Sequence, residues 1–345
     1  MKKTKTFIGL FLVVCICLFY FFNQTTVFII VKDDAKSYKY NENSGFITRG
    51  FLKEKVLAIT ENTLQTETKE SFNIYLRTDT ENKFELLQES KVKFTEPKKI
   101  AILYISTGKY IRFWKDFYNS ANKNFLPRHE KTFFLFTNHD DVKVESNVVK
   151  IHQDQLPWPY ITLKRYHFFD AIKDKLKEFD YIYFMNGDLL VSKPVNEEVL
   201  PTDEQEFVVT LHPWYFMSDI NLVPYERNHK SASYIPYDFG KYYVQGAFNG
   251  GTAKGFIKLI ETLKAWTDRD LENGIIPIWH DESMLNKYLM IKLDNGHFPL
   301  ILSPAYVYPE KYGHGAEEFY PKQTIINKEN YGGIDYLRSM DENNN

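Results

Sequence analysis

The pattern of apolar and polar positions changes at about residue 97. Before it, "SFNIYLRT" (Ser71–Thr78) and "KFELLQES" (Lys83–Ser90) alternate along a Lys-, Glu- and Thr-rich segment, which predicts short strands. After it, Ile100–Ile105 is a continuous apolar run that ends in Ser-Thr-Gly, typical of a buried parallel strand that leads into a loop. We therefore expect a stem or small β-rich spacer over residues 32–96 and a larger domain over 97–345.

Within the larger domain, strand patterns alternate with helical ones. "TFFLFT", "NVVKIHQ" and "YIYFM" have the composition of strands. Apolar residues recur at helical spacing over Phe113–Phe125, Tyr166–Phe179, Phe256–Trp266 and Met284–Leu289. This alternation predicts an α/β domain with a mostly parallel sheet covered on both faces. Ligands of such sheets bind at the carboxyl ends of the strands.

Two polar segments follow predicted strands, Thr107–Tyr110 and the triplet Asn186-Gly187-Asp188. Asn-Gly is a common hairpin signal, so the triplet has a purely structural interpretation. As a site, the Asp188 carboxylate can share a divalent cation with a diphosphate, and the Asn186 amide can bind a ribose or phosphate oxygen. Both interpretations remain open from the residues alone.

A second polar cluster is "WHDE", Trp279 to Glu282, just before a helical pattern. Asp281 and Glu282 suit the positive end of a helix, so simple capping is one interpretation. The other is chemical: an indole for the apolar face of a sugar, and a carboxylate beside an electron-poor anomeric carbon. Likewise, His212 fits a core or a site, and Lys164-Arg165 fits a solvated face or a phosphate-binding cation.

The N-terminus has the pattern of a membrane anchor. Lysines precede an apolar run over Phe7–Phe22, and the run continued to Val31 is long enough for a spanning helix of roughly 20 residues. A cleaved signal peptide is the alternative, but no small-x-small cleavage site follows. The positive N-terminal side indicates a cytoplasmic end. We expect a short tail and signal-anchor helix over residues 1–31, hence a single-pass type II membrane protein.

Charge and cysteine content exclude two other classes. The formal net charge of −2 argues against a nucleic-acid partner, because no basic field exists to neutralise phosphates. The two cysteines, Cys15 and Cys17, both lie in the N-terminal apolar run. They provide neither a disulfide framework nor a Cys/His zinc site for the larger domain.

Several ordered motifs together resemble glycosyltransferase family 6, which includes the blood group A and B transferases, the α-1,3-galactosyltransferase and bacterial relatives. They are "ILYISTGKYIRFWKDFY", the triplet after "DYIYF", "TLHPWYF", "YERNHKSASYIPYDFGKYYVQGAFNGG" and "IPIWHDESMLNKYL". The resemblance covers roughly Lys99–Arg338. It implies a GT-A fold. It also implies retaining transfer of GalNAc or Gal from a UDP-sugar to the 3-hydroxyl of a galactose-containing glycan, in α-1,3 linkage.

The resemblance also implies roles for individual residues. Glu282 matches the proposed nucleophile or charge stabiliser, and Val244 and Gly246 match the pair that selects the donor. Donor contacts are implied for Ile105, Thr107, Tyr110, Arg165, Asn186, Asp188, Val244, Gly246, Asp281 and Lys328, and acceptor contacts for His212 and Trp279. Because Gly246 leaves room for an acetamido group, the pair favours GalNAc slightly over Gal.

The triplet departs from the family's pattern. Asn186 stands where the vertebrate enzymes, which use Mn²⁺, have the first Asp of Asp-x-Asp, while many bacterial members have Asn-x-Asn and need no metal. Asp188 is thus the one candidate ligand that the triplet offers to Mn²⁺. Losing an anionic ligand weakens metal binding, and Arg165 and Lys328 are cations that can neutralise a diphosphate instead.

Two alternatives stand beside this interpretation. One is a catalytically inactive UDP- or carbohydrate-binding member of the same fold, supported by Asn186. The other is a transferase that uses a different donor, such as UDP-glucose. The expected location is the Golgi if the source is eukaryotic and the inner membrane if it is bacterial.

Overall fold

The computed structural model describes residues 96–340 except 216–217, 219, 238, 241 and 312–320, together with the backbone of seven strands between Thr25 and Leu86. The chain divides into two units, Met1–Leu87 with Glu317–Tyr320 and Gln88–Ala316 with Pro321–Asn345.

The described part of the N-terminal unit is an antiparallel sheet. Its strands are β1 Thr25–Val31, β2 Ser37–Asn41, β3 Phe46–Arg49, β4 Leu52–Ile59, β5 Thr63–Thr66, β6 Ser71–Thr78 and β7 Lys83–Leu86. They pair in sequence order, and an additional pairing of β1 with β6 closes the first six strands into a ring. The strands predicted from the alternating segments are confirmed as β6 and β7.

The expected anchor segment needs one correction. Its last seven residues, Thr25–Val31, form strand β1 and not the end of a helix. The physical reason is composition, because six of these residues in "TTVFIIV" are β-branched and favour strands over helices. The rest of the predicted anchor, residues 1–24, lies outside the described residues. Among the described residues, no helix is long and apolar enough to cross a membrane.

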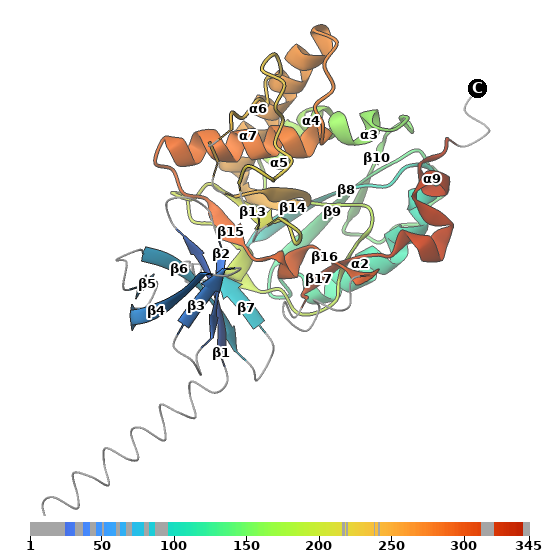
Figure 1. Ribbon diagram of the computed structural model, residues 1–345. Coiled ribbons are helices and arrows are strands. Elements are labelled where there is room, and N and C mark those ends of the chain that lie inside the picture. Colours follow the sequence, from blue (N-terminus) through green and yellow to red (C-terminus); the bar gives the residue numbers. More distant parts are fainter. Residues whose placement is uncertain are drawn as a thin grey trace, which may run out of the picture. The chain divides into compact units, whose positions relative to one another are not determined.

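The larger unit is built on a seven-stranded mixed sheet (Figure 1). Its order is β10-β9-β8-β11-β14-β13-β15. The strands are β8 Lys99–Ile105, β9 Glu130–Thr137, β10 Val148–His152, β11 Tyr181–Met185, β13 Phe207–Leu211, β14 Val244–Thr252 and β15 Leu300–Leu302. Neighbours are parallel except for β14, which is antiparallel to both β11 and β13. The mostly parallel α/β sheet is therefore confirmed.

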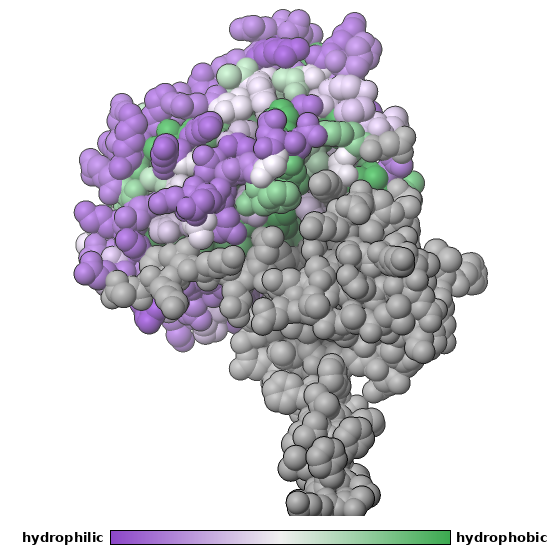
Figure 2. Space-filling model, turned by 90° about the vertical axis from the view of Figure 1, so that its left-hand side faces the viewer, coloured by the Kyte–Doolittle hydropathy of each residue, from purple (hydrophilic) through white to green (hydrophobic). Residues whose placement is uncertain are grey.

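Helices cover this sheet on both faces (Figure 1). On one face, α2 (Trp114–Asn124) packs Phe117 against Tyr104 of β8, with stacked rings 3.9 Å apart. On the other, Phe169 of α4 (Arg165–Asp170) lies 5.5 Å from Phe184 of β11, and α6 (Ala253–Glu272) and α7 (His280–Asp294) pack on β14. The side of this unit that Figure 2 shows is mostly hydrophilic with smaller apolar patches, as expected when the apolar sides of the helices face the sheet.

One helix prediction is only partly confirmed. The helical face expected over Tyr166–Phe179 is divided among short helices, α4 and α5 (Lys173–Leu176), which follow α3 (Tyr160–Leu163). Its apolar residues still point inward, because Tyr166, Phe169 and Leu176 are fully buried. Three further short helices of the larger unit are η1 Gly108–Phe113, η2 Glu197–Val199 and η3 Pro304–Tyr306.

The order of the sheet determines where a ligand can bind. From β8 the chain first builds outward through β9 and β10, then returns to the other side of β8 as β11. A crevice forms at the carboxyl ends of two strands where the order reverses in this way. Met185 of β11 pairs with Tyr104 of β8, so the loops that follow these strands leave the sheet side by side. Antiparallel β14 starts at the same edge, where the Asn186 N–H donates to the Ala247 carbonyl over 2.9 Å.

A second, three-stranded sheet brings the C-terminal segment to this edge. Strand β12 (Leu189–Val191) pairs with β17 (Gln323–Ile325), which also pairs with β16 (Tyr308–Pro309). The hydrogen bond from the Ile326 N–H to the Asp188 carbonyl, 2.8 Å long, extends this pairing to the triplet. The chain then continues into η5 (Lys328–Tyr331) and α9 (Gly333–Arg338), and α9 packs on η1.

Candidate active site

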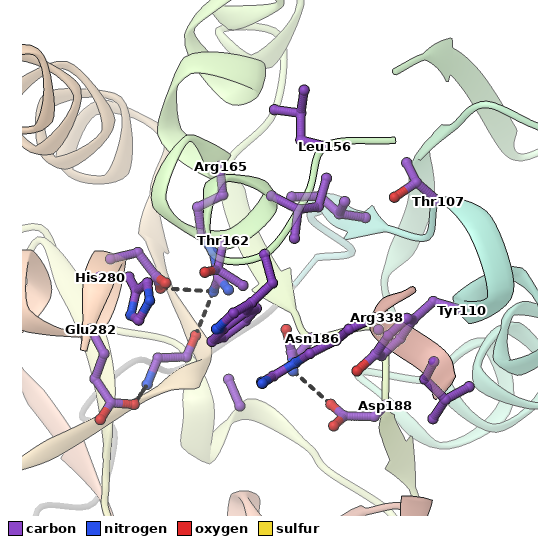
Figure 3. A pocket seen from close by; sticks show the side chains of 18 of the residues that line it. Thr107, Tyr110, Leu156, Thr162, Arg165, Asn186, Asp188, His280, Glu282 and Arg338 are labelled. Carbon is purple, nitrogen blue, oxygen red and sulfur yellow. Dashed lines mark hydrogen bonds and ion pairs between the residues drawn. The ribbon is translucent and has the colours of Figure 1, made fainter. Parts of the chain in front are cut away.

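A cleft of about 220 Å³ lies at the edge where β8, β11 and β14 meet (Figure 3). Eleven of the thirteen residues predicted from the sequence line it: Ile105, Thr107, Tyr110, Arg165, Asn186, Asp188, Gly246, Trp279, Asp281, Glu282 and Lys328. The other two, His212 and Val244, are buried outside the lining. The two polar clusters of the sequence thus belong to one site, with Asp188 and Glu282 on opposite sides of the view in Figure 3.

The triplet is a turn, but it does not connect a hairpin. The Leu189 N–H donates to the Asn186 carbonyl over 3.0 Å, and the Tyr104 hydroxyl donates to the Gly187 carbonyl over 2.7 Å. Strand β12, which follows the turn, pairs with β17 in a different sheet from β11. A Cβ on Gly187 would lie 2.9 Å from the Ile105 carbonyl oxygen, so glycine permits the close approach of the two loops.

Asp188 is buried and has a partner for each carboxylate oxygen. The Asn186 amide nitrogen donates to its Oδ1 over 2.6 Å, and the Lys328 ammonium forms an ion pair with its Oδ2. Burial lowers the pKa of Lys328, but the charge of Asp188, its hydrogen bond to Lys328 and the nearby Tyr110 together outweigh burial, and the net pKa is raised. Lys328 is therefore a cation at neutral pH, held at the end of β11.

This donor set does not fit a resident divalent metal. Mn²⁺ and similar ions take several oxygen ligands, among them one or two carboxylates whose oxygens must be free to coordinate. The triplet supplies one carboxylate, whose oxygens are already bonded to an amide and an ammonium group. No group of three His, Cys, Asp or Glu that could hold a metal occurs among the residues that the structure describes. The positive charge beside the triplet carboxylate is that of the Lys328 ammonium group.

The opposite side of the cleft is formed by the first turn of α7. Asp281 is buried, and its Oδ2 lies 3.1 Å from Arg165 Nη1, which also donates to the Gly246 carbonyl over 3.0 Å. The guanidinium carbon of Arg165 lies 4.2 Å from the centre of the Phe184 ring. Burial raises the pKa of Asp281 to about 6 even though Arg165 opposes this change. Arg165 is thus a buried cation, and the solvated-face interpretation of this residue is wrong.

Both oxygens of Glu282 are hydrogen-bonded. The Gly246 N–H donates to Oε2 over 2.8 Å, and the Tyr243 hydroxyl donates to Oε1 over 2.7 Å. Burial raises the pKa of Glu282 to about 7, while these two hydrogen bonds lower it. The side chain of the N-cap residue of α7, Trp279, makes no capping hydrogen bond, and the Trp279 N–H donates to the Ser283 hydroxyl over 3.0 Å. Simple helix capping therefore does not account for Asp281 and Glu282, which bond to Arg165 and β14 instead.

His212 and Val244 lie behind this wall of the cleft. His212 is 6% exposed and accepts a hydrogen bond from the Trp214 N–H over 3.2 Å. Burial lowers the pKa of His212 to about 3, so the ring is neutral at physiological pH. The Asn286 side chain bonds the backbone N–H and carbonyl of Val244 at 2.9 and 2.8 Å. The predicted ligand contacts of His212 and Val244 remain predictions.

The sequence interpretation missed several residues of the cleft. Arg338, at the end of α9, places its guanidinium carbon 3.3 Å from the centre of the Trp158 ring, which lies 4.9 Å from His280. All three line the cleft, as does Gln155. One feature of the sequence could have indicated Arg338: it is a second cation in the same short C-terminal segment as Lys328. No local pattern separates Trp158 from a core aromatic residue.

An α/β domain with a mixed sheet and a polar cleft at its switch point fits a GT-A-like fold. The model of glycosyltransferase family 6 matches residues 79–332, and the chain belongs to this family. The resemblance inferred from the motifs is thus confirmed.

Curated relatives of the chain come from bacteria and vertebrates. It is 34% identical over 220 residues to the O-antigen biosynthesis glycosyltransferase WbnI of Escherichia coli, covering 63% of this chain and 91% of that protein. It is 31% identical over 222 residues to histo-blood group ABO system transferase 1 of Rattus norvegicus, covering 61% of each. It is 28% identical over 243 residues to globoside alpha-1,3-N-acetylgalactosaminyltransferase 1 of Gallus gallus, covering 66% of this chain and 67% of that protein.

Proposed function

We propose that this hexosyltransferase moves GalNAc or Gal from a UDP-sugar to the 3-hydroxyl of a galactose-containing glycan, with retention at the anomeric carbon. The observation that carries the proposal is the arrangement of one cleft, with a cation at one end and a held carboxylate at the other. Lys328 and Asp188 form the first end, and Glu282 with Asp281 forms the second. A nucleoside diphosphate sugar matches this order, because its diphosphate is negatively charged and its anomeric carbon becomes electron-poor as the diphosphate leaves.

In this proposal the nucleotide lies over the loops after β8 and β11. Ile105, Thr107 and Tyr110 contact the uridine, and Lys328 neutralises the charge that develops on the diphosphate as it leaves. Arg338 adds a second cation at the same end. The donor sugar then lies toward Glu282 and Asp281, with Trp279 at the rim of the cleft, 45% exposed, as a surface for the acceptor.

The reaction breaks the bond between the anomeric carbon and the UDP oxygen and forms one to the acceptor 3-oxygen. The acceptor proton passes to the departing phosphate. Glu282 acts in one of two ways, as a nucleophile that forms a glycosyl intermediate or as a carboxylate that stabilises an oxocarbenium-like state. In both routes its negative charge must face the anomeric carbon, which requires the ionised form.

We expect turnover without added metal. Purified protein given UDP-GalNAc or UDP-Gal and a galactose-terminated acceptor should release UDP equally fast in excess EDTA and in Mn²⁺, because Lys328 occupies the cation position beside Asp188. Lys328→Ala should lower the rate in EDTA by about 10²-fold. Turnover abolished by EDTA and restored by Mn²⁺ would contradict the metal-free proposal. UDP binding with no turnover in either condition would support the inactive alternative.

Gly246 offers a test of the donor preference. An added Cβ would lie 3.0 Å from Asp281 Oδ2 and 3.6 Å from Glu282 Oε2, within the space proposed for the sugar. Gly246→Ala should therefore reduce kcat/KM for UDP-GalNAc relative to UDP-Gal by about tenfold, because the acetamido group needs that space. The ratio of the two donors on the same preparation corrects for any loss of folded protein. An unchanged ratio would remove Gly246 from the donor-selecting pair.

We also propose that residues 1–24 anchor the protein in a membrane, in the Golgi of a eukaryote or the inner membrane of a bacterium. The support is the lysine-flanked apolar run of the sequence. Extraction of the native protein with carbonate and with detergent tests this proposal. Release by carbonate alone would contradict it.

A further inference from the structure

Tyr243 is a buried tyrosine that the motif analysis did not include among the site residues. Its side chain is 1% exposed, yet its hydroxyl donates a 2.7 Å hydrogen bond to Oε1 of Glu282. The other oxygen, Oε2, accepts from the backbone N–H of Gly246 over 2.8 Å. In the described part of the chain, Tyr243 is the side chain that hydrogen-bonds this carboxylate. With one donor on each oxygen, Glu282 cannot rotate without losing a hydrogen bond.

The Tyr243 ring is itself held firmly in place. Its centre lies 5.2 Å from the ring of Tyr215, 5.5 Å from Tyr225 and 5.6 Å from His212. His212 therefore contributes to the site indirectly, because its ring packs against the ring of Tyr243. The phenol is thereby restricted to one orientation, which a hydrogen bond to a reacting group requires.

Asn286 fixes the backbone next to Tyr243 relative to Glu282. Its side-chain oxygen accepts from the Val244 N–H, and its side-chain nitrogen donates both to the Val244 carbonyl and, over 2.9 Å, to the backbone carbonyl of Glu282. Asn286 is completely buried. It therefore joins the start of β14 to the first turn of α7, and so sets the distance between the phenol and the carboxylate.

We propose that Tyr243 is a positioning residue for transfer, which orients the Glu282 carboxylate toward the anomeric carbon and stabilises its ionised form. The inference rests on the proposed catalytic role of Glu282. Tyr243 lies behind the wall of the cleft, and its hydroxyl acts on the reaction only through Glu282. The rate of the chemical step should thus depend on Tyr243, while binding of the donor should not.

The direction of the pH effect follows from the groups that face Glu282. Burial raises its pKa, and the Asp281 charge adds to this, while Gly246, Tyr243 and Arg165 lower it. The Tyr243 hydroxyl bonds to the charged form, so its removal raises the pKa of Glu282 further. A reaction that needs ionised Glu282 then loses rate at a higher pH than before. The acidic limb of the pH profile should move up by about one unit.

The test compares Tyr243→Phe with Tyr225→Phe. Tyr225 is the matched control, because it is a buried tyrosine whose ring lies 5.5 Å from that of Tyr243 and whose hydroxyl donates to the Tyr242 carbonyl. The Glu282 carboxylate instead accepts from the Tyr243 hydroxyl and the Gly246 N–H. Tyr243→Phe should lower kcat at pH 7 by about tenfold, shift the acidic limb upward and leave the donor KM unchanged. Tyr225→Phe should keep the wild-type pH profile.

Equal pH profiles for the two variants would overturn the inference. Near-UV circular dichroism establishes that each variant is folded. If Tyr243→Phe does not fold, Asn286→Ala is the second variant, because it keeps the phenol but releases the backbone beside it; an unshifted acidic limb there would also overturn the inference. Wild type and Glu282→Gln are measured alongside. An inactive wild type, or an active Glu282→Gln, contradicts the proposed function itself and is thus distinguished from a failure of Tyr243.

Discussion

Replacing Glu282 with glutamine should lower kcat for sugar transfer by about 10³-fold while the affinity for UDP stays unchanged. Glutamine has the size of glutamate but no charge, so it cannot attack or stabilise an electron-poor anomeric carbon. It also presents an amide nitrogen to one of two donors, the Tyr243 hydroxyl or the Gly246 N–H, which now bond to carboxylate oxygens. The proposed UDP position is at the other end of the cleft, near Lys328, so UDP affinity should not change.

The wild-type pH profile is part of the same prediction. Because the pKa of Glu282 is raised to about 7, wild-type transfer should decline as the pH falls through about 7 and the carboxylate gains a proton. The residual rate of Glu282→Gln should not change over that range. UDP release with each donor and isothermal titration with UDP provide the measurements. The control is Glu178→Gln on the exposed surface, which should behave as wild type. Full activity in Glu282→Gln would remove Glu282 from the mechanism.

Replacing Arg165 with methionine should reduce the free energy of unfolding by about 3–5 kcal/mol and abolish measurable transfer. The methionine keeps an unbranched apolar stem against Phe184 but removes the cation that faces Asp281. Asp281 is 5% exposed, so its carboxylate would be left buried without its counter-ion. The hydrogen bond to the Gly246 carbonyl is lost as well, which releases the strand that donates to Glu282.

The stability loss should depend on pH in a defined direction. The pKa of Asp281 in the folded protein is about 6, above its ordinary value, so its contribution favours folding at low pH and is lost as the pH rises through about 6. Without Arg165 this pKa rises further, so the deficit of Arg165→Met should be larger at pH 8 than at pH 5. Urea unfolding at the two pH values measures it.

The matched control for Arg165→Met is Arg128→Met. The Arg128 side chain is 71% exposed and forms an ion pair with Glu197, and an exposed pair contributes only about 0–1 kcal/mol. A deficit of that small size in Arg165→Met, equal at both pH values, would show that Asp281 does not depend on Arg165 for its charge.

Local patterns predicted most strands of the larger unit and the strand ends at which the candidate site lies. The apolar run before Ser106, the "YIYFM" strand and the acidic start of α7 all occur as expected, because they depend on burial periodicity within a few residues. The helix expected up to Phe179 is divided, and Thr25–Val31 is a strand, because tertiary packing and β-branched side chains outweigh a simple apolar count.

Sequence alone could also identify which residue types gather at the site, but not which atoms they contact. It indicated Lys328 and Asp188 as separate candidates 140 positions apart along the chain, and only the pairing of β12 with β17 makes them an ion pair. No local pattern singled out Tyr243, which is a buried core aromatic residue whose hydroxyl bonds to Glu282. Such contacts depend on how strands and helices distant in the chain are placed, and that placement is a property of the packed sheet and not of any local segment.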